Sequence, residues 1–213
     1  MINRMLAYTI LCLFAFLTFG TAKADTIGPS CGSCLGSSYT LSYSTTSNAN
    51  AFDVFLTVDT TGFTNASSDL LDAVSLKLVS QNSDISSVSL LAAPATFGST
   101  ALGGLSAGGC SGAGGGFFCS QSTGNGVPVA HSGDVYTFEW LLTVTSPSDL
   151  LTGLDAASLK ALYNTAGGRQ DGITSEDISL TQASSVPEPS SLLLLGTGVV
   201  GLAGIIRRRV ARA

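Results

Sequence analysis

Apolar and polar positions alternate with a period of two in two long runs of the chain. Every second residue is large and apolar from Phe52 to Val58, and again from Tyr136 to Val144. Successive side chains of a β-strand point to opposite faces, so this pattern predicts two half-buried strands. Weaker runs of the same kind predict further strands at Tyr39–Ser44, Ala73–Val79, Val88–Ala92 and Ile178–Thr181.

Turn signals separate these runs, at Thr61-Gly62, Asn82-Ser83-Asp84 and Ser132-Gly133-Asp134. Short strands joined by turns rich in Gly, Ser, Asn and Asp are typical of antiparallel sandwiches. We therefore expect a mostly β fold, with an antiparallel β-sandwich ectodomain over residues 25–185.

The segment Asp155–Tyr163 has two interpretations. Its Ala, Leu and Lys residues favour a short helix, which Asp155 would cap. The segment Leu154–Lys160 also repeats Leu71–Lys77 with six of seven residues identical. If the two copies share a conformation, both are strands, and the sequence leaves this choice open.

A glycine-rich segment, Ala93–Gly116, contains nine glycines. Glycine-rich loops can cradle phosphate, but no Gly-Lys-Ser/Thr ending follows this one. We expect a long, flexible surface loop here.

The N-terminus has the three parts of a secretory signal peptide. Arg4 supplies a positive charge, Leu6–Phe19 forms an apolar core, and Ala22 and Ala24 form a small-residue cleavage site. A core of this length is short for a bilayer span, which argues against the alternative of a permanent N-terminal anchor. We expect residues 1–24 to be a signal peptide that is removed after Ala24.

The C-terminus has a proline motif, an apolar stretch and a basic cluster. Pro187 and Pro189 keep the motif extended, because proline breaks helices and strand ladders. The 17 residues 190–206 carry no charge and would reach about 25 Å as a helix, close to the roughly 30 Å of a hydrocarbon core. We expect a single transmembrane helix, with Arg207, Arg208 and Arg209 on the cytoplasmic side.

This tail resembles the PEP-CTERM sorting signal of Gram-negative bacteria. The resemblance rests on the motif Val186, Pro187, Glu188 and Pro189, the glycine-rich apolar helix and the terminal arginines. It implies that residues 186–213 are a sorting signal and that exosortase, a membrane-embedded enzyme, is a partner. It also implies a transient stage in the inner membrane, then a place at the cell surface or outside the cell, in association with exopolysaccharide and biofilm. The alternative is a plain anchor helix that is never cut.

The charge balance limits the partners of the ectodomain. Only 11% of the chain is charged, against about 25% in an average protein. Residues 25–186 contain three basic and thirteen acidic residues, a net charge of about −10. Nucleic-acid binding needs clustered Lys and Arg, so we exclude it.

Four cysteines remain once Cys12 is removed with the signal peptide: Cys31, Cys34, Cys110 and Cys119. An even number in an exported chain predicts disulfides. Three pairings are possible, of which we favour Cys110–Cys119 with a local Cys31–Cys34 bridge. A C-x-x-C redox motif and a zinc site are the alternatives.

Candidate catalytic groups are few, and we expect no catalytic residue, no metal and no cofactor. The lone His131 stands beside a turn, and Glu139, Glu176 and Glu188 are the only glutamates. The oxygen-rich stretch Asp59–Asp69 is a calcium candidate, but it does not match the EF-hand spacing, and we favour an ordinary turn. We expect Trp140 to belong to the core rather than to a glycan-binding surface.

The sequence thus predicts an exported, non-enzymatic protein of the cell surface or extracellular matrix. Two alternative functions imply the same localisation: a secreted hydrolase acting on matrix polysaccharide, and a carbohydrate- or calcium-binding adhesive module. Acids converging in a cleft would favour the hydrolase, and an exposed aromatic platform would favour the binding module.

Overall fold

Two antiparallel sheets account for most of the computed structural model. The structure describes residues 26–64, 70–124, 126–129, 134–165 and 170–183. The chain divides into two units, Met1–Ala183 and Ser184–Ala213, and every described residue belongs to the first. The expected signal peptide, transmembrane helix and sorting motif lie outside the described residues, and the first two stay predictions.

The first sheet contains both long alternating runs, which pair with each other. Trp140 lies opposite Val54, and Phe138 lies opposite Leu56. The two apolar stripes therefore share one face, as their common period requires. The sheet has the order β1 (Thr26–Ile27), β2 (Ser38–Thr45), β3 (Ala51–Asp59), β11 (Val135–Val144) and β5 (Ile85–Ala92), and β14 (Thr181–Gln182) pairs with β2 in parallel.

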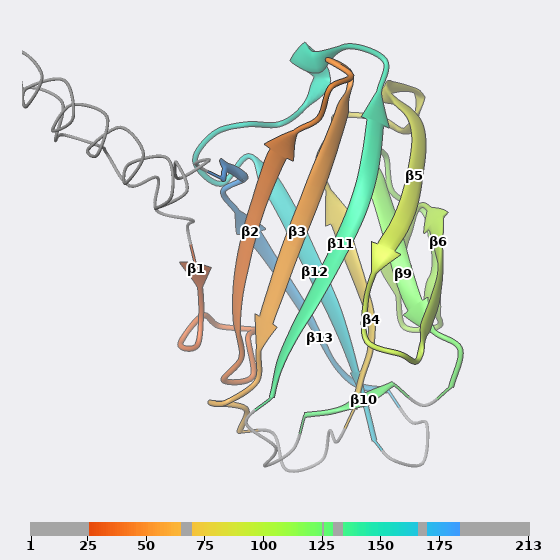
Figure 1. Ribbon diagram of the computed structural model, residues 1–213. Coiled ribbons are helices and arrows are strands. Elements are labelled where there is room, and N and C mark those ends of the chain that lie inside the picture. The colour runs from red at the N-terminus through yellow and green to blue at the C-terminus, as the bar shows by residue number, and fades with distance from the viewer. Residues whose placement is uncertain (1–25, 65–69, 125, 130–133, 166–169, 184–213) are drawn as a thin grey trace, which may run out of the picture. The chain divides into compact units, whose positions relative to one another are not determined.

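The second sheet lies behind the first, as Figure 1 shows. The expected antiparallel, mostly β fold is confirmed, and the sheets form the two layers of a sandwich. A separate two-stranded sheet pairs β7 (Gly104–Ser106) with β8 (Gly109–Gly112). The second sheet has the order β13 (Gln170–Ile178), β12 (Ala157–Asn164), β4 (Leu70–Lys77), β9 (Phe117–Ser122) and β6 (Phe97–Leu102), and β10 (Val127–Pro128) pairs with β4.

Trp140 lies in the core between the sheets, as expected. Its side chain is fully buried, stacks on Phe138 at 5.6 Å between ring centroids, and meets the ring of Phe118 edge-on at 5.5 Å. The indole nitrogen donates a hydrogen bond of 2.8 Å to Oγ of Ser120 on the second sheet. This bond satisfies the one polar atom of the indole, which is otherwise costly to bury.

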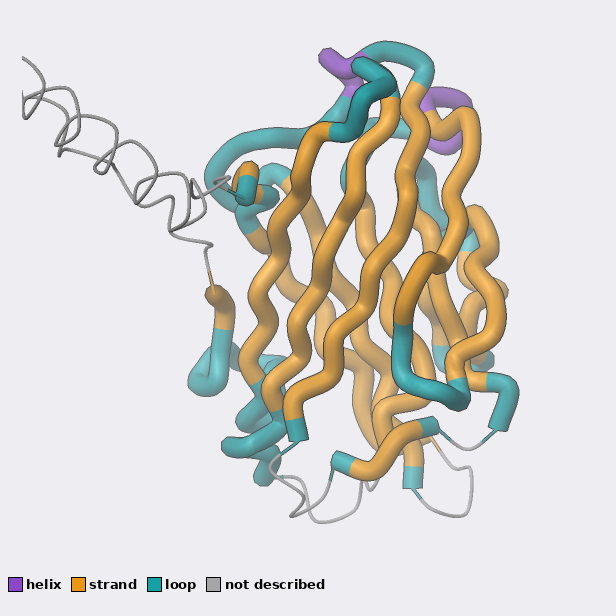
Figure 2. The backbone as a smooth tube through the Cα atoms, viewed as in Figure 1, coloured by secondary structure: helices purple, strands orange, loops and turns teal. Residues whose placement is uncertain are grey.

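The loops and two short 3₁₀ turns lie outside the sheets, mostly at the ends of the strands (Figure 2). The 3₁₀ turns are η1 (Asn82–Asp84) and η2 (Pro147–Asp149), and η1 coincides with an expected turn. Among the described residues, no helix is long and apolar enough to cross a membrane.

The open choice at Asp155–Tyr163 is settled in favour of a strand. β12 begins at Ala157, and Asp155 precedes it at a positive φ of 51°, so the helix interpretation is wrong. The two repeat copies differ in detail, since Leu71–Lys77 lies wholly within β4 while the second copy begins in a turn. Their last residues pair, with Ser158 opposite Lys77.

Two other expectations need correction. Ile178–Thr181 is not one strand, because β13 ends at Ile178 and β14 begins at Thr181. The glycine-rich segment is not a long loop, because it holds β6, β7 and β8. Glycine is needed where this segment crosses close to other backbone: Gly116 has φ of +77°, and a Cβ there would collide with the carbonyl oxygen of Val79.

Candidate functional sites

The four cysteines form two disulfides, with the pairing that the sequence favoured. Cys110 on β8 is joined to Cys119 on β9, with their Cα atoms 5.5 Å apart. Cys31 is joined to Cys34 within a turn, with a Cα separation of 5.3 Å. Thiolates are the ligands of zinc and the nucleophiles of redox exchange. While both bridges are formed, these four cysteines offer no thiolate to a zinc ion or to redox exchange.

The Cys31–Cys34 turn is held against the second sheet by Glu176 on β13. Oε1 of Glu176 accepts hydrogen bonds from the backbone nitrogen of Ser33 at 3.2 Å and from its hydroxyl at 2.6 Å. The hydroxyl of Thr174 donates to the carbonyl oxygen of Ser33 at 2.9 Å. In the described part of the chain, Cys31, Cys34 and Glu176 are the one group of metal-ligand side chains that converge, within 4.8 Å. Because the sulfurs are joined to each other, Glu176 here fixes the turn.

A buried hydroxyl network joins the two sheets beneath this turn. The hydroxyls of Tyr39 and Tyr163 lie 2.5 Å apart, and Tyr163 donates to Oγ of Ser37 at 3.2 Å. Burial raises the pKa of both phenols, and that of Tyr163 lies well above its ordinary value. Both phenols are therefore neutral hydrogen-bonding groups at neutral pH rather than acids or bases.

The calcium candidate at Asp59 is organised as a turn. Oδ1 of Asp59 accepts bonds from both the backbone nitrogen, at 2.9 Å, and the hydroxyl of Thr61. These bonds lower the pKa of this carboxyl. This is the local capping expected of an Asx turn, which accounts for the carboxylate without a cation. The other end of the candidate, Asp69, lies outside the described residues.

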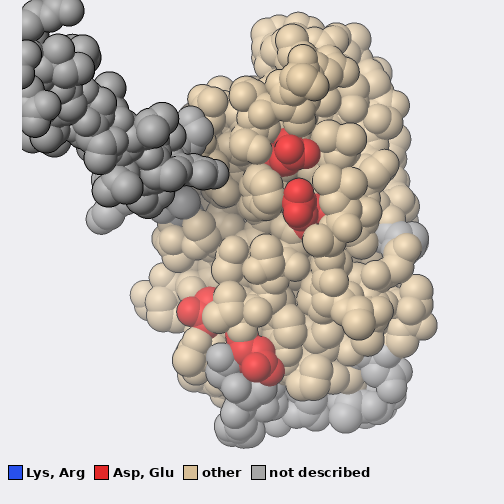
Figure 3. Space-filling view, viewed as in Figure 1, with Lys and Arg blue, Asp and Glu red and all other residues tan. Residues whose placement is uncertain are grey.

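Two of the four catalytic candidates lie among the described residues, and those two lie in different sheets. Glu139 lies on β11 opposite Phe55, in the first sheet, whereas Glu176 lies on β13 in the second. His131 and Glu188 lie outside the described residues. Among the described residues on the face of the first sheet, Figure 3 shows acidic side chains and no Lys or Arg.

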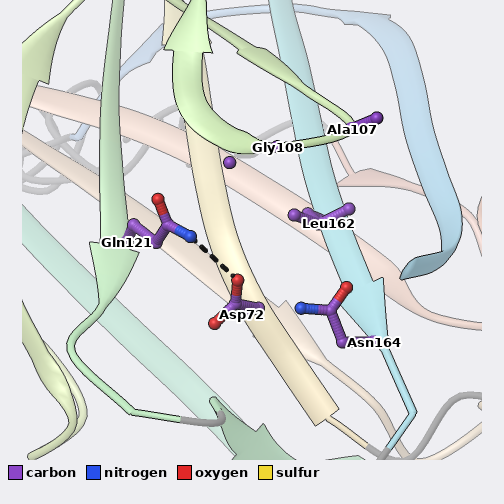
Figure 4. A pocket seen from close by; sticks show the side chains of 7 residues that line it. Asp72, Ala107, Gly108, Gln121, Leu162 and Asn164 are labelled. Atoms are coloured by element: carbon purple, nitrogen blue, oxygen red, sulfur yellow. Dashed lines mark hydrogen bonds between the residues drawn. The ribbon is translucent and has the colours of Figure 1, made fainter. Parts of the chain in front are cut away.

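The second sheet carries a small polar pocket that sequence reasoning missed. Its volume is about 220 Å³. In Figure 4, Asp72 of β4 lies between Gln121 of β9 and Asn164 of β12, below the turn that joins β7 to β8. The lining consists of Asp72, Ala107, Gly108, Gly109, Gln121, Leu162 and Asn164.

A β-bulge aims Asp72 into this pocket. On β12, Leu162 lies opposite Ala73 and the next residue, Tyr163, lies opposite Leu71, so Asp72 is the extra residue. An extra residue re-aims a side chain, and bulges are common next to functional sites. Asp72 is only 5% exposed, although acidic side chains are rarely buried. A buried acid within the apolar run of β4 is the signal that could have identified the site.

Gln121 connects the pocket to the hairpin formed by β7 and β8. Its Nε2 donates to Oδ2 of Asp72 at 3.0 Å, and its Oε1 accepts from the backbone nitrogen of Cys110 at 3.0 Å. The Cys110–Cys119 bridge holds the same hairpin to β9. Gly109 presses so closely on Gln121 that a Cβ would collide with it. The β7–β8 hairpin, which forms one wall of the pocket, is therefore held by a disulfide, by a hydrogen bond to Gln121 and by the close packing of Gly109 on Gln121.

Comparison with known proteins identifies the tail. A family model, the PEP-CTERM protein-sorting motif, matches residues 185–209. No curated protein matches the chain significantly. Among solved structures, a cohesin module from a Clostridium perfringens ATCC13124 family 33 glycoside hydrolase aligns with a TM-score of 0.31 and 11% identity. That alignment covers 68% of this chain and 96% of the module.

Proposed function

We propose, from the PEP-CTERM sorting motif that this chain carries, that it is an exported, non-enzymatic protein of the cell surface or extracellular matrix. The motif at residues 185–209 is the observation that carries the proposal. It implies export and sorting by exosortase after a membrane-anchored stage. In our account the signal peptide starts export, and the helix at 190–206 holds the chain in the inner membrane until exosortase acts.

The ectodomain has properties that suit an oxidising exterior. Two disulfides tie down its loops, and such bridges persist outside the cytoplasm. Its excess of acidic residues keeps it soluble and repels anionic glycans at low salt. Divalent cations would bridge that repulsion, which suits a component of an exopolysaccharide matrix.

The absence of catalysis is part of the proposal. Enzymes hold groups with tuned pKa values close together. Among the described residues, Glu139 and Glu176 lie in different sheets, and Glu176 is occupied by Ser33. The polar pocket favours the binding-module alternative over the hydrolase, since one carboxylate there lacks the partner that glycoside hydrolysis requires.

Fractionation of the native host, with and without its exosortase, tests the sorting step. With exosortase, we expect the protein at the surface or in the medium; without it, the protein should stay in the inner membrane. Replacing Pro187, Glu188 and Pro189 by Ala should reproduce that retention in the exosortase-positive host. An unchanged distribution in the absence of exosortase would refute the proposal.

Single substitutions test the non-enzymatic part. We expect His131→Ala, Glu139→Gln and Glu176→Gln to leave the biofilm or surface phenotype of the host unchanged. Loss of a general acid or base typically costs about 10²–10⁴-fold in rate, so an enzymatic role would be evident. A variant that is folded and exported, yet abolishes the phenotype, would favour the hydrolase.

A further inference from the structure

We propose that the pocket formed by Asp72, Gln121 and Asn164 binds a single sugar unit, and binds it most tightly when the sugar carries a free amino group. Sugar binding is inferred from the lining of the pocket alone. We further infer that the sugar is a unit of the matrix exopolysaccharide, and this step rests on the proposed function above.

The pocket offers a carboxylate that can accept further hydrogen bonds, since a carboxylate has about four acceptor positions. Figure 4 shows the amide nitrogen of Asn164 turned toward Asp72, while Oδ1 of Asn164 is buried without a hydrogen-bond partner in the described structure. Among the described residues, the carboxylate of Asp72 receives one hydrogen bond, from Gln121. A buried acceptor without a donor is costly, and nearly all such groups in native proteins are satisfied. A ligand that completes the hydrogen bonding of the Asp72 carboxylate must therefore present donors.

The negative charge of the pocket lining favours a neutral or cationic ligand. The described lining contains one carboxylate and no Lys or Arg, and the whole ectodomain is acidic. An anionic ligand would meet repulsion, whereas an ammonium group beside Asp72 would form a charge-assisted hydrogen bond. A calcium ion normally takes six to eight oxygen ligands, including several carboxylates, and this lining supplies only one carboxylate.

Size points to one sugar ring. The volume of about 220 Å³ falls below the roughly 300–1,000 Å³ that is typical of sites for drug-sized ligands. Leu162 and Ala107 give the lining a small apolar surface beside the polar groups. A hexosamine combines a compact ring, several hydroxyl donors and one ammonium group, which matches the lining of this pocket.

The pocket is also pre-formed. The bulge in β4 directs the side chain of Asp72 into the pocket. Both amide atoms of Gln121 form hydrogen bonds, and the Cys110–Cys119 disulfide holds the β7–β8 hairpin in place. Binding to a site whose groups are already ordered avoids the entropic cost of ordering them. A weak ligand such as a monosaccharide needs this advantage.

The test uses the full chain in a zwitterionic detergent, labelled with ¹⁵N at glycine, because Gly108 and Gly109 line the pocket. Glucosamine, glucose and glucuronate are titrated separately and followed by NMR. We expect the signals of Gly108 and Gly109 to shift, with the tightest binding for glucosamine, weaker binding for glucose and none for glucuronate. No shift with glucosamine, or binding of glucuronate as tight as that of glucosamine, would overturn the proposal.

Variants assign the binding to the pocket. Asp72→Asn keeps the shape and should weaken glucosamine binding at least about tenfold, since hydrogen bonds to charged groups are the strongest in such sites. Asn164→Leu removes the amide group that lines the pocket beside Asp72, so it should lower binding of glucosamine and glucose; it also removes a buried oxygen without a partner, so it should not lower stability. The matched control is Asp177→Asn, a carboxylate of the same sheet that accepts a bond from Ser158 at 2.9 Å and lies outside the pocket lining.

If both pocket variants bind glucosamine with wild-type affinity, the proposal that this pocket is the binding site is wrong. Signals of the remaining glycines report whether each variant is folded. Failure of sorting in the host would leave this titration unaffected, because it uses purified protein. A negative titration with normal sorting would reject the sugar site and leave the proposed function standing.

Discussion

Tyr39 and Tyr163 bring two phenol hydroxyls into the core, where they meet at 2.5 Å. Burial raises the pKa of both, and of Tyr163 most strongly. In the unfolded chain, each phenol ionises near its ordinary pKa of about 10. Their contribution to stability is therefore complete below about pH 10 and is lost as pH rises toward the folded-state pKa.

We predict that the unfolding free energy falls above about pH 10 and that Tyr163→Phe makes this fall shallower. Removing one titrating phenol reduces the slope of the unfolding free energy against pH by up to about 1.4 kcal/mol per pH unit. Urea unfolding between pH 8 and pH 11 measures both curves. Phe63→Leu is the control, because Phe63 packs on the Tyr163 ring at 5.0 Å without titrating. Its curve should lie lower but run parallel to wild type. Parallel curves for wild type and Tyr163→Phe would contradict this account.

A second single-residue prediction concerns Ser120. Its hydroxyl accepts the indole hydrogen bond of Trp140, so Ser120→Ala leaves a buried N–H without a partner. We expect a loss of about 1–3 kcal/mol in unfolding free energy. In a Trp140→Phe background, the same change should cost clearly less, since no indole N–H remains. Equal costs in the two backgrounds, measured by chemical denaturation, would show that this bond does not stabilise the fold.

At the scale of elements, the β7–β8 hairpin depends on one bridge. Cys110–Cys119 closes a loop of about ten residues, for which a disulfide contributes about 2–3 kcal/mol. We predict that the double change Cys110→Ala and Cys119→Ala lowers the unfolding free energy by about this amount. Amide hydrogen exchange should accelerate most at β7 and β8. The corresponding change at Cys31 and Cys34 is the comparison, and it should leave exchange at the hairpin unaltered.

The sequence predicted the elements that have one buried and one exposed face. β3 and β11 alternate clearly because one sheet face is core and the other is open. β4 does not, since six consecutive residues from Leu71 to Leu76 are buried. The β7–β8 hairpin covers the outer side of this strand, and such covering cannot be read from the strand's own pattern.

Other elements were missed for reasons of composition. β7 and β8 are three and four residues long and rich in glycine, which has low strand propensity. They form because backbone pairing and a disulfide replace side-chain packing. The pocket was missed because Asp72, Gln121 and Asn164 come from three strands. A bulge at Asp72, invisible in the sequence, places them together.

At the scale of the whole molecule, an acidic ectodomain is joined to a tail whose family is recognised. Residues 185–209 match the PEP-CTERM protein-sorting motif, and the apolar stretch at 190–206 is followed by three arginines. In the topology that we propose, the arginines lie on the cytoplasmic side and the acidic domain lies outside. A permanent anchor would not need the motif Pro187–Pro189 between the domain and the apolar stretch. We therefore predict that exosortase cuts the chain near this motif.

The intact mass of the protein released by a host with active exosortase tests this central claim most directly. We predict a mass that lacks residues 1–24 and lacks the C-terminal segment with Arg207, Arg208 and Arg209. It should also be lower by about four hydrogens than the reduced chain, because both disulfides are formed. Released protein that retains Arg207–Arg209 and ends at Ala213 would contradict the account.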